Sequence, residues 1–438
     1  MTSSKWLTPE QRRLDASAFA EGGQAIRHRI QQLRAPVERL DQVARLYNEA
    51  RFARTYVPDP AHGFPYLTGS DMLLVDLTGL LYISRAKTPQ ARRLQVGAGW
   101  TLISCSGTVG RTVYARSEMA GFVLSHDVIR AIPALDGIQP GYLFAFLSTR
   151  HAQAMLRQRM YGSVVQHIEP AHIADLPVPI PDDREGKAID ALVRSAADGR
   201  TTAAALLHGT AAHFDSLAPG FRYGHEHERA EAIASSTLLH GRLDAFHHAG
   251  WAAEAAEVGG DHISALASVS RPSLIKRVFV DRGIPFVSGV DVYHARPSYR
   301  SRIMTREAER AAAFIHAGQL LVQRSGQRYG LLGRPALVGR SLDGFAASED
   351  LIRVSPTTPA AAARIFSFLR SDLGRRTLLR TSYGTSIPHL NPDGVAGIRV
   401  PALPTALQAE AEDALRLREL ADAAEEEAIQ RIEAWLDS

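Results

Sequence analysis

Two stretches of the chain, GFPYLTGSDM from Gly63 and GIPFVSGVDV from Gly283, follow one pattern. In both, glycine is followed by an apolar residue, proline, an aromatic residue, an apolar residue and a small residue. A second glycine, a variable residue, aspartate and an apolar residue complete the pattern. The two stretches begin 220 residues apart (283 − 63). Nine matching positions out of ten, at such a distance, indicate that a whole segment of chain is duplicated.

Five further pairs of similar blocks occur in the same order, at offsets between 219 and 229 residues. The period is far longer than that of a solenoid repeat. It matches the usual size of a domain, so the sequence predicts two tandem domains of one fold. The pairs are RLDASAF (Arg13) with RLDAFHH (Arg242), LDQVARLYNEARFARTYV (Leu40) with LASVSRPSLIKRVFV (Leu266), AGWTLISCSGTVGRTVYA (Ala98) with AGQLLVQRSGQRYGLLGRPALV (Ala317), GFVLSHDVIRAIP (Gly121) with GFAASEDLIRVSP (Gly344), and FAFLSTRHAQAMLRQRMYGSVVQHIEPAHIADLPVPIP (Phe144) with FSFLRSDLGRRTLLRTSYGTSIPHLNPDGVAGIRVPALP (Phe366).

Each half predicts the same order of short elements. Phe64–Leu67 and Ile284–Val287 read as strands that end before a glycine, and DVIRAIP and DLIRVSP read as strands stopped by proline. One helix is expected over residues 141–160 and another over 360–379, from the helical spacing of their apolar residues. Strands and helices do not alternate as in a doubly wound sheet. Each half is therefore predicted to be α+β, with a mixed, mostly antiparallel sheet plus helices.

A helical segment follows each half. Residues 405–438 lack Pro and Gly, are rich in Ala, Leu and Glu, and form a long apolar stripe. Residues 182–215 show a similar stripe, which Gly199 and Gly209 are expected to interrupt. We expect two long antiparallel helices that pack on each other, separate the two domains and relate them by a pseudo-twofold internal repeat. The predicted segments are a first domain (1–181), a first spacer helix (182–216), a linker (217–236), a second domain (237–404) and a second spacer helix (405–438).

Charge is distributed unevenly along the chain. Residues 405–438 contain ten acidic and three basic residues, a net charge of −7, so the remainder carries +11 for a total of +4 (11 − 7). A basic body suits a polyanionic partner, although a solvated basic surface explains it as well. The single cysteine, Cys105, suits a reducing compartment, and no signal peptide or apolar run of membrane-spanning length is evident. The sequence thus predicts a cytoplasmic protein with no membrane partner.

No catalytic signature stands out. There is no phosphate-binding Gly-Lys-Ser/Thr loop, and one cysteine cannot form a zinc ribbon. GHEHERAE from Gly224 lacks the metalloprotease spacing and reads as a solvated segment. His126-Asp127 resembles part of a catalytic triad, but its counterpart, Glu349-Asp350, has no histidine. Ser106 and Ser325 both precede glycine, which turn geometry explains.

Arginine, lysine and aromatic residues occur in the expected loops of both halves. Arginine contacts phosphates and guanine, and glutamine contacts adenine. The densest basic stretch, HARPSYRSRIMTREAER from His294, also fits a helix surface with Arg–Glu pairs. The halves differ most between Asp71–Gly97 and Asp291–Ala317. Variable segments on a duplicated scaffold suit two different readings of an asymmetric, two-part DNA target.

The duplicated set resembles one family, the specificity (S) subunits of type I restriction–modification enzymes. The resemblance depends on ordered pairs of motifs that cover nearly the whole chain, each set followed by a long helix. Gly326–Gly330 departs from the family pattern that Gly107–Gly110 keeps. The motifs are GFPYLTGSD with GIPFVSGVD, ISCSGTVGR with VQRSGQRYG, SHDVIRAIP with SEDLIRVSP, and YGSVVQHIEPAHIADLPVPIP with YGTSIPHLNPDGVAGIRVPALP.

The resemblance implies a non-catalytic subunit that reads an asymmetric bipartite site in double-stranded DNA. Each half would be a target-recognition domain. Two methyltransferase subunits, which bind S-adenosylmethionine and methylate adenine, would dock on the chain, and a restriction motor subunit could join them. The chain itself would hold no cofactor, metal or catalytic residue. From the basic loops and the family motifs, the predicted DNA-binding residues are Arg85, Lys87, Arg92, Arg93, Arg111, Tyr161, Ser163, Arg300, Arg302, Arg324, Gln327, Arg328, Tyr383 and Thr385.

Two alternatives remain open from the sequence. The chain could be a specificity-like DNA-binding scaffold in another phage-defence system, whose partner is not an adenine methyltransferase. It could also be a stand-alone nuclease or hydrolase, which scattered acidic residues permit without supporting.

Overall fold

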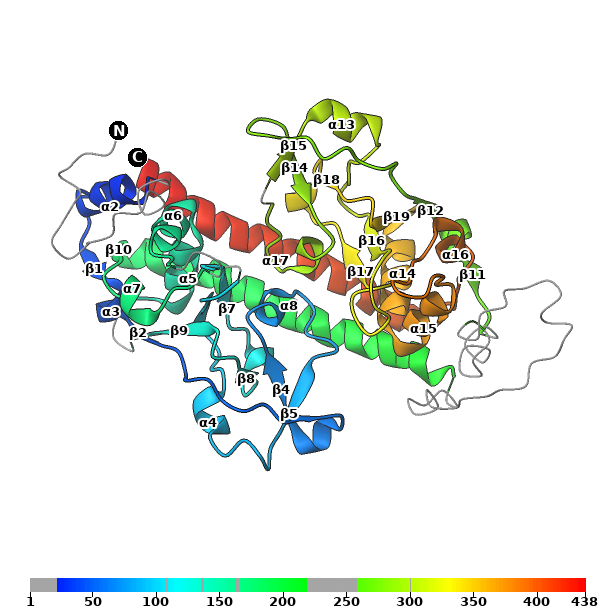
Figure 1. Ribbon diagram of the computed structural model, residues 1–438, viewed down its shortest axis with the longest axis horizontal. Helices are drawn as coiled ribbons and strands as arrows, with labels where there is room; N and C mark the ends of the chain where they lie inside the picture. The colour runs from blue at the N-terminus through cyan, green and yellow to red at the C-terminus, as the bar shows by residue number, and fades with distance from the viewer. Residues whose placement is uncertain are drawn as a thin grey trace, which may run out of the picture. The chain divides into compact units, whose positions relative to one another are not determined.

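The computed structural model describes residues 22–107, 109–134, 138–161, 166–218, 247, 258–299 and 301–438 (Figure 1). The predicted linker 217–236 lies almost entirely outside these residues, as do the segment from Gly224, Ser163 and Arg300. The chain divides into two compact units. Unit 1 comprises residues up to Thr201 together with Leu420–Ser438, and unit 2 comprises Thr202–Glu419.

Unit 1 contains three small sheets. Their strand orders are β1-β10, β2-β9-β6-β7 and β3-β5-β4-β8. All neighbouring strands are antiparallel except β4 and β8, which are parallel. The strands are β1 (Val37–Arg39), β2 (Ala44–Tyr47), β3 (Tyr56–Val57), β4 (Gly63–Leu67), β5 (Leu81–Ser84), β6 (Thr101–Ser104), β7 (Thr112–Tyr114), β8 (Val123–Leu124), β9 (Val128–Pro133) and β10 (Pro177–Pro179).

Unit 2 repeats this topology strand for strand. Its sheets have the orders β11-β20, β12-β19-β16-β17 and β13-β15-β14-β18, and again only one pair, β14 with β18, is parallel. The fold class is therefore confirmed as mixed α+β with two similar sheet-rich regions. The strands are β11 (Asp261–His262), β12 (Ala267–Ser270), β13 (Phe279–Val280), β14 (Ile284–Val287), β15 (Ser301–Ile303), β16 (Leu320–Gln323), β17 (Pro335–Leu337), β18 (Ala346–Ala347), β19 (Leu351–Pro356) and β20 (Arg399–Val400).

Short helices pack beside these sheets, most of them at corresponding places in the two units. Those of unit 1 are α2 (Gly23–Gln31), α3 (Leu40–Val43), η2 (Pro60–His62), η3 (Asp71–Leu73), α4 (Ala91–Leu94), η4 (Ser117–Met119), α5 (Pro140–Ser148), α6 (Arg150–Gln158) and α7 (Pro170–Ile173). Those of unit 2 are α12 (Ile263–Leu266), η5 (Asp291–Tyr293), α13 (Thr305–Arg310), η6 (Arg340–Leu342), α14 (Pro359–Arg370), α15 (Asp372–Arg380) and α16 (Pro392–Ala396).

The sequence predicts one helix after β9 and one after β19, but the structure has two helices at each place. Thr149 separates α5 from α6 and is extended, with ψ 152°. Its hydroxyl donates to Phe146 O (2.7 Å) and accepts from Ala152 N (3.1 Å), so it ends one helix and caps the next. Ser371 does the same between α14 and α15. The cap residues were visible in the sequence, but the continuous apolar spacing masked them.

Two long helices complete the fold, α8 (Asp183–Ser216) and α17 (Thr405–Asp437). The expectation that Gly199 and Gly209 interrupt the first helix is wrong. Each glycine costs a helix interior about 1 kcal/mol, which the burial of apolar neighbours such as Ala203 and Leu207 outweighs.

Each unit contains a stretch of both long helices. In unit 1, Arg431 of α17 donates to Glu185 of α8 (2.9 Å), whereas Arg200 of α8 contacts Asp422 (2.8 Å) and Glu425. The two helices therefore run antiparallel. In unit 2, Leu207 of α8 and Ala414 of α17 belong to one hydrophobic core.

A buried arginine recurs in the strand that ends at proline. Arg130 in β9 is fully buried, and its guanidinium donates to the carbonyls of Val128 (3.2 Å) and Leu94 (3.3 Å). Arg353 in β19 donates to Ala313 O (2.6 Å). Burial lowers the pKa of the Arg353 guanidinium to about 10. Each arginine thus joins its central strand to the segment that leads into the neighbouring strand of the same sheet, β6 in unit 1 and β16 in unit 2.

The two segments that differ most in sequence share one fold. Asp71–Gly97 forms η3, β5 and α4, and Asp291–Ala317 forms η5, β15 and α13. β5 pairs with β3 on one side and with β4 on the other, and β15 pairs with β13 and β14 in the same way. The scaffold is therefore duplicated although its side chains have diverged.

Candidate nucleic-acid interface

Two loops lie side by side in each unit. We call residues 105–110 and 324–330 the Ser-Gly loops, and residues 161–167 and 383–389 the Tyr-Gly loops. Thr108 and residues 162–165 of the first pair lie outside the described residues. The Ser-Gly loops join β6 to β7 and β16 to β17. The Tyr-Gly loops follow the capped helices α6 and α15.

In both units a histidine at the end of the Tyr-Gly loop connects this loop to the Ser-Gly loop. His167 exchanges both backbone hydrogen bonds with Tyr161 (2.9 and 2.8 Å) and forms a bridge to Ser106. His389 exchanges the same bonds with Tyr383 (2.9 and 2.8 Å) and forms a bridge to Ser325. The duplicated motifs contain this histidine, but sequence reasoning did not single it out. Its presence at one place in both copies was the available signal.

Side chains reinforce this junction in unit 2. The Ser325 hydroxyl donates to Asp350 Oδ1 (2.8 Å) and lies 2.8 Å from His389 Nδ1. Arg324 approaches both Ser325 (3.2 Å) and Asp350 (3.4 Å). Because the serine proton goes to Asp350, His389 Nδ1 is the donor in its contact with the serine oxygen.

This Ser–His–Asp group is not arranged for nucleophilic catalysis. An activated serine needs a base that accepts its proton, and the base needs a carboxylate behind it. Here the carboxylate of Asp350 contacts the serine, and the histidine donates to it. The group is arranged to hold three loops in one place.

The predicted residues of the second Ser-Gly loop also connect the loops. Gln327 Nε2 donates to Ser386 O (3.1 Å), and Arg328 Nε donates to Ser382 Oγ (3.2 Å). Arg375 of α15 donates to the carbonyl of Arg328 (3.1 Å). The glutamine amide group and the arginine Nε are thereby oriented by the facing loop.

Apolar and aromatic side chains are exposed along this loop pair. Tyr329 is 86% exposed, Ile387 57% and Tyr383 41%. Thr385 is exposed beside them. In unit 1 the Tyr161 hydroxyl donates to Glu169 (2.7 Å), and this hydrogen bond raises the tyrosine pKa. Exposed rings beside fixed polar groups provide surfaces on which nucleobases can stack.

A second group of side chains lies on the β3 and β13 sheets. Arg54 stacks over Tyr66 (5.5 Å), and Arg277 stacks over Phe286 (6.0 Å). An exposed ring accompanies each of them, Tyr56 at 47% and Phe279 at 53%. Both units therefore place an arginine at an equivalent position over a ring that packs edge-on against a second, exposed ring, where the arginine can contact phosphate.

A tight turn connects this group with the loop pair. Residue 126 or 349 faces the sheet arginine: Arg54 contacts His126 Nδ1 (3.3 Å) and Arg277 donates to Glu349 (3.2 Å). The next residue faces the Ser-Gly loop, since Asp127 O accepts from Cys105 N (3.0 Å). We call the sheet arginine, this turn and the loop pair together the reading face of each unit.

The reading faces differ in charge at this turn. Burial lowers the pKa of His126, so at neutral pH its imidazole is uncharged and Arg54 keeps its positive charge. In unit 2 the Glu349 carboxylate balances Arg277. The unit 1 face is therefore the more positive of the two at this position.

The remaining predicted residues lie on the diverged segments or next to the loops. Arg85 is exposed and stacks on Phe64 (4.3 Å), and Arg302 of β15 stacks on Tyr299 (4.9 Å) while donating to its hydroxyl (2.6 Å). Arg93 pairs with Glu49 (3.4 Å). Exposed Lys87 and Arg92 flank the same segment, and Arg111 follows the first Ser-Gly loop. The structure thus brings the predicted residues together in two groups in each unit, one on the loop pair and one on the diverged segment.

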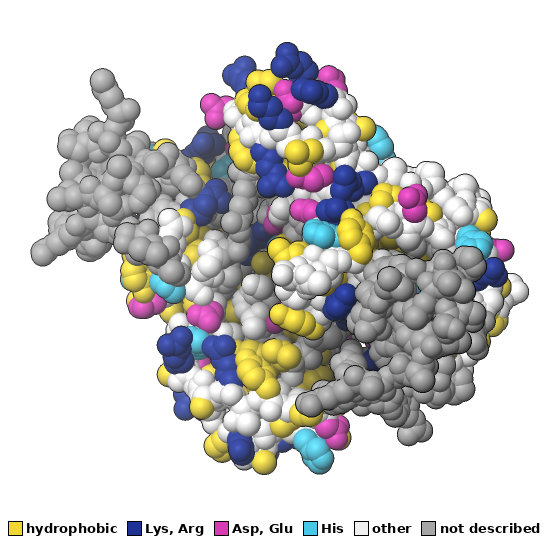
Figure 2. Space-filling model, turned by 45° about the vertical axis from the view of Figure 1, so that its right-hand side comes forward, with side chains coloured by type: hydrophobic (Ala, Val, Ile, Leu, Met, Phe, Trp, Pro, Cys, Tyr) yellow, Lys and Arg dark blue, Asp and Glu magenta, His cyan; other side chains and the backbone are white. Residues whose placement is uncertain are grey.

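Basic side chains gather over the diverged segment of unit 2. Figure 2 shows Lys and Arg side chains at the top of the view, over the end formed by β15 and α13. Arg306 of α13 is exposed and lies 3.6 Å from Glu307. Only Thr305–Arg310 of this stretch forms a helix, and its Arg306–Glu307 pair joins adjacent residues, the glutamate being buried.

Three further features of the described residues concern the cysteine, metal binding and membrane spans. Burial and the nearby Asp127 raise the pKa of the Cys105 thiol to about 12, so it stays protonated. Among the described residues, no group of three or more His, Cys, Asp or Glu side chains is placed to hold a metal ion. No helix in the described part of the chain combines the length and apolar character of a membrane span.

Comparison with known proteins found similar solved structures only. No protein-family model matches the chain, and no curated protein does. Among solved structures, the S subunit of a type I restriction–modification system from M. genitalium matches 92% of this chain and 95% of its own, with 14% identity and a TM-score of 0.34. The HsdS subunit from Thermoanaerobacter tengcongensis matches 92% and 95%, with 13% identity and a TM-score of 0.29. A chain from a study of the assembly and conformational transition of a type I system matches 91% and 99%, with 12% identity and a TM-score of 0.28. The first two of these structures are specificity subunits of type I systems.

Proposed function

We propose that this chain is a DNA sequence-specificity subunit that reads an asymmetric bipartite target and has no catalytic role of its own. The observation that carries the proposal is the reading face, which occurs twice on one topology with different side chains. A symmetric target would need two identical faces. The His126–Glu349 difference and the diverged segments support two different half-sites.

The long helices support a spacer role. Each unit packs its core on a stretch of both α8 and α17. A helix that continues from one unit into the next is stiff over its length, so it suits fixing the gap between two half-sites.

The partners belong to the same proposal. Two methyltransferase subunits would dock on this chain and supply S-adenosylmethionine chemistry on adenine, and a restriction motor subunit could join. The chain would contribute binding and orientation only. The Ser325 geometry supports that division, since its hydroxyl faces a carboxylate directly and lacks the histidine base, held by a carboxylate, of a catalytic triad.

The test is to express the chain together with the methyltransferase genes that neighbour its gene and to map methylated adenines genome-wide. We expect methylation at one asymmetric motif made of two short half-sites and a fixed gap. Omitting this chain should abolish it. DNA binding without adenine methylation would favour a scaffold of another defence system, and magnesium-dependent cleavage by the purified chain alone would overturn the proposal.

A further inference from the structure

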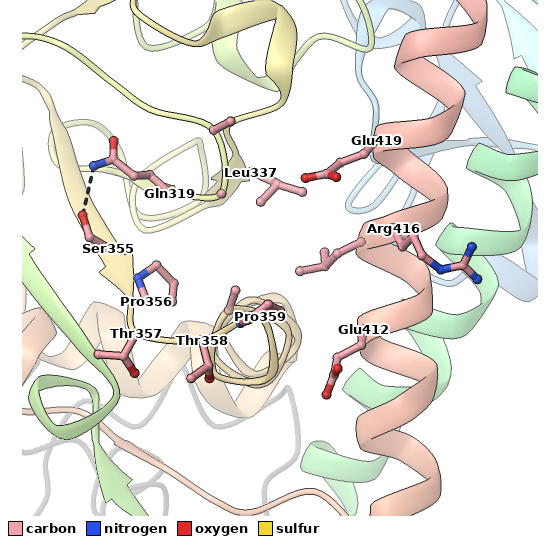
Figure 3. A pocket seen from close by; sticks show the side chains of 14 residues that line it. Gln319, Leu337, Ser355, Pro356, Thr357, Thr358, Pro359, Glu412, Arg416 and Glu419 are labelled. Carbon is pink, nitrogen blue, oxygen red and sulfur yellow. Dashed lines mark hydrogen bonds between the residues drawn. The ribbon is translucent and has the colours of Figure 1, made fainter.

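A pocket opens in unit 2 where unit 1 is filled by one of its own side chains. The pocket has a volume of about 410 Å³ and lies between the end of β19, the start of α14 and one face of α17 (Figure 3). Leu337, Ala362 and Leu415 form its apolar wall, and Glu412 and Glu419 stand at its α17 side. Figure 3 shows both glutamates directed toward the cavity and the guanidinium of Arg416 directed away.

Tyr114 occupies the equivalent position of unit 1. Tyr114 pairs with Thr101 at the end of the β6–β7 hairpin, as Leu337 pairs with Leu320 at the end of β16–β17. Its ring packs edge-on against Phe144 (5.8 Å).

The glycines beside the two positions show the difference in space. The Tyr114 hydroxyl lies 3.6 Å from where a Cβ on Gly99 would be. At the matching Gly318 of unit 2, which lines the pocket, nothing lies within 4 Å of that point. The volume that the phenol takes in unit 1 is open in unit 2.

Two further differences keep the pocket open. Gly141, eight residues before Thr149, lets α5 approach α8 so closely that a Cβ there would lie 2.8 Å from Asp190 Oδ1. The residue eight before Ser371 is Ala363, whose methyl group prevents the same approach. Asp190, the eighth residue of α8, accepts from Gly141 N (2.7 Å). The eighth residue of α17 is the longer Glu412, which accepts from Gln408 of its own helix (2.8 Å).

From this comparison we infer that the unit 2 pocket accepts the side chain of a tyrosine from a protein partner. The phenol ring would lie on Leu337 and Leu415, as the Tyr114 ring lies on the core of unit 1. Its hydroxyl would donate to Glu412 or Glu419. The carboxylates at the rim favour a donor such as a phenol over an anionic group. The pocket opens at the surface beside α17, so a tyrosine on a protruding loop can enter. This inference does not rest on the proposed DNA reading.

Ligand-observed NMR on the full chain tests the chemistry of the pocket. The probes are 4-methylphenol, toluene, and a soluble pentapeptide with tyrosine, or leucine in its place, between glycines and serines. We expect the phenol and the tyrosine peptide to bind, and toluene and the leucine peptide to bind at least ~5-fold more weakly because they lack the hydroxyl.

The variant Leu337→Tyr should refill the pocket as Tyr114 does and weaken phenol binding by about tenfold or more, because the new ring takes the volume that the probe needs. Leu337→Met conserves the volume and should keep the affinity. Thermal unfolding of both variants shows that the fold is intact. If Leu337→Tyr misfolds, Glu412→Leu replaces it and should reduce the preference for phenol over toluene. Unchanged binding to folded Leu337→Tyr, equal binding of toluene, or binding of free 4-methylphenol without the tyrosine peptide would each overturn the inference.

Discussion

One pair of residues, His126 and Glu349, changes the charge beside equivalent arginines of the two reading faces. Arg54 and Arg277 occupy equivalent positions, each stacked on a ring. The side chain opposite them is His126 in unit 1 and Glu349 in unit 2. Since only glutamate is anionic at neutral pH, the same arginine is available to a phosphate in one unit and neutralised in the other. In the sequence this difference only excluded a shared triad; the structure shows that it sets local charge.

Exchanging these partners should exchange their effect on DNA binding. Glu349→His releases the charge of Arg277 and is expected to strengthen binding of the assembled complex, with a steeper dependence on salt by up to ~0.9 in log–log slope for one added phosphate contact. His126→Glu should weaken binding and flatten the dependence. Fluorescence anisotropy at several salt concentrations measures both. Parallel shifts of the two variants in one direction would contradict the assignment.

The lowered pKa of His126 also predicts a pH dependence of stability. Burial disfavours the imidazolium, while Asp127 favours it and Arg54 opposes it. The unfolded chain therefore binds the proton more readily, so stability is fully present above the ordinary pKa of 6.5 and is lost as the pH falls through the lowered value. His126→Gln should flatten this part of the curve in urea unfolding between pH 7 and pH 5. An unchanged slope would show that His126 does not contribute.

At the scale of elements, the helix pair depends on a buried charge cluster. Arg200 of α8 is buried and contacts Asp422 and Glu425 of α17. Burial alone would lower the pKa of this guanidinium, but the two carboxylates outweigh it and raise the pKa. Periodicity predicted that these helices pair; it could not predict that a charged residue would fix their register.

Removing one partner of this cluster should be costly. Arg200→Met removes a buried cation that contacts both Glu425 and Asp422, and we expect a loss of about 3–5 kcal/mol in the free energy of unfolding. The double variant Arg200→Met with Glu425→Met should recover part of it, because the buried carboxylate is removed together with the cation and only the more exposed Asp422 loses its contact with Arg200. Denaturant unfolding with a double-mutant cycle measures the coupling. Additive effects of the two substitutions would contradict a direct interaction.

The buried arginine of β19 makes a second element-scale prediction. Arg353→Met removes the charged donor to Ala313 O, which still accepts from Ala347 N (2.9 Å), and a hydrogen bond from a charged donor contributes about 1.5–3 kcal/mol. Arg399→Met, at an exposed position of the same unit, is the matched control and should be near neutral. Equal melting temperatures of the two variants would show that the buried arginine is dispensable.

For the whole molecule, the duplication was the feature that the sequence revealed best. Ordered pairs of motifs predicted two copies of one α+β fold, and strand orders agree in every sheet. The breaks at Thr149 and Ser371 were missed because capping hydroxyls sit within apolar spacing. Side-chain hydrogen bonds such as Ser325–Asp350 join residues that are distant in the sequence, so no local sequence pattern predicts them. The DNA-binding residues predicted on the loops remain predictions.

Truncation before Thr405 makes a prediction at this scale. It removes Ala428 and Ile432 from the core of unit 1 and Ala414 from that of unit 2. We therefore expect loss of the complex with methyltransferase on size-exclusion chromatography. The co-expressed chain with Glu426→Lys, at an exposed position of α17, controls for charge. A complex of full size from the truncated chain would rule out a role for α17 in assembly.

The most direct test of two independent readers on one scaffold is a half exchange. Asp15–Pro181 is replaced by the same region of a relative, the chimaera is expressed with its methyltransferase, and methylated adenines are mapped across the genome. We expect one half of the methylated motif to change while the other half and the gap stay the same. A motif in which both halves change together, or neither does, would contradict it.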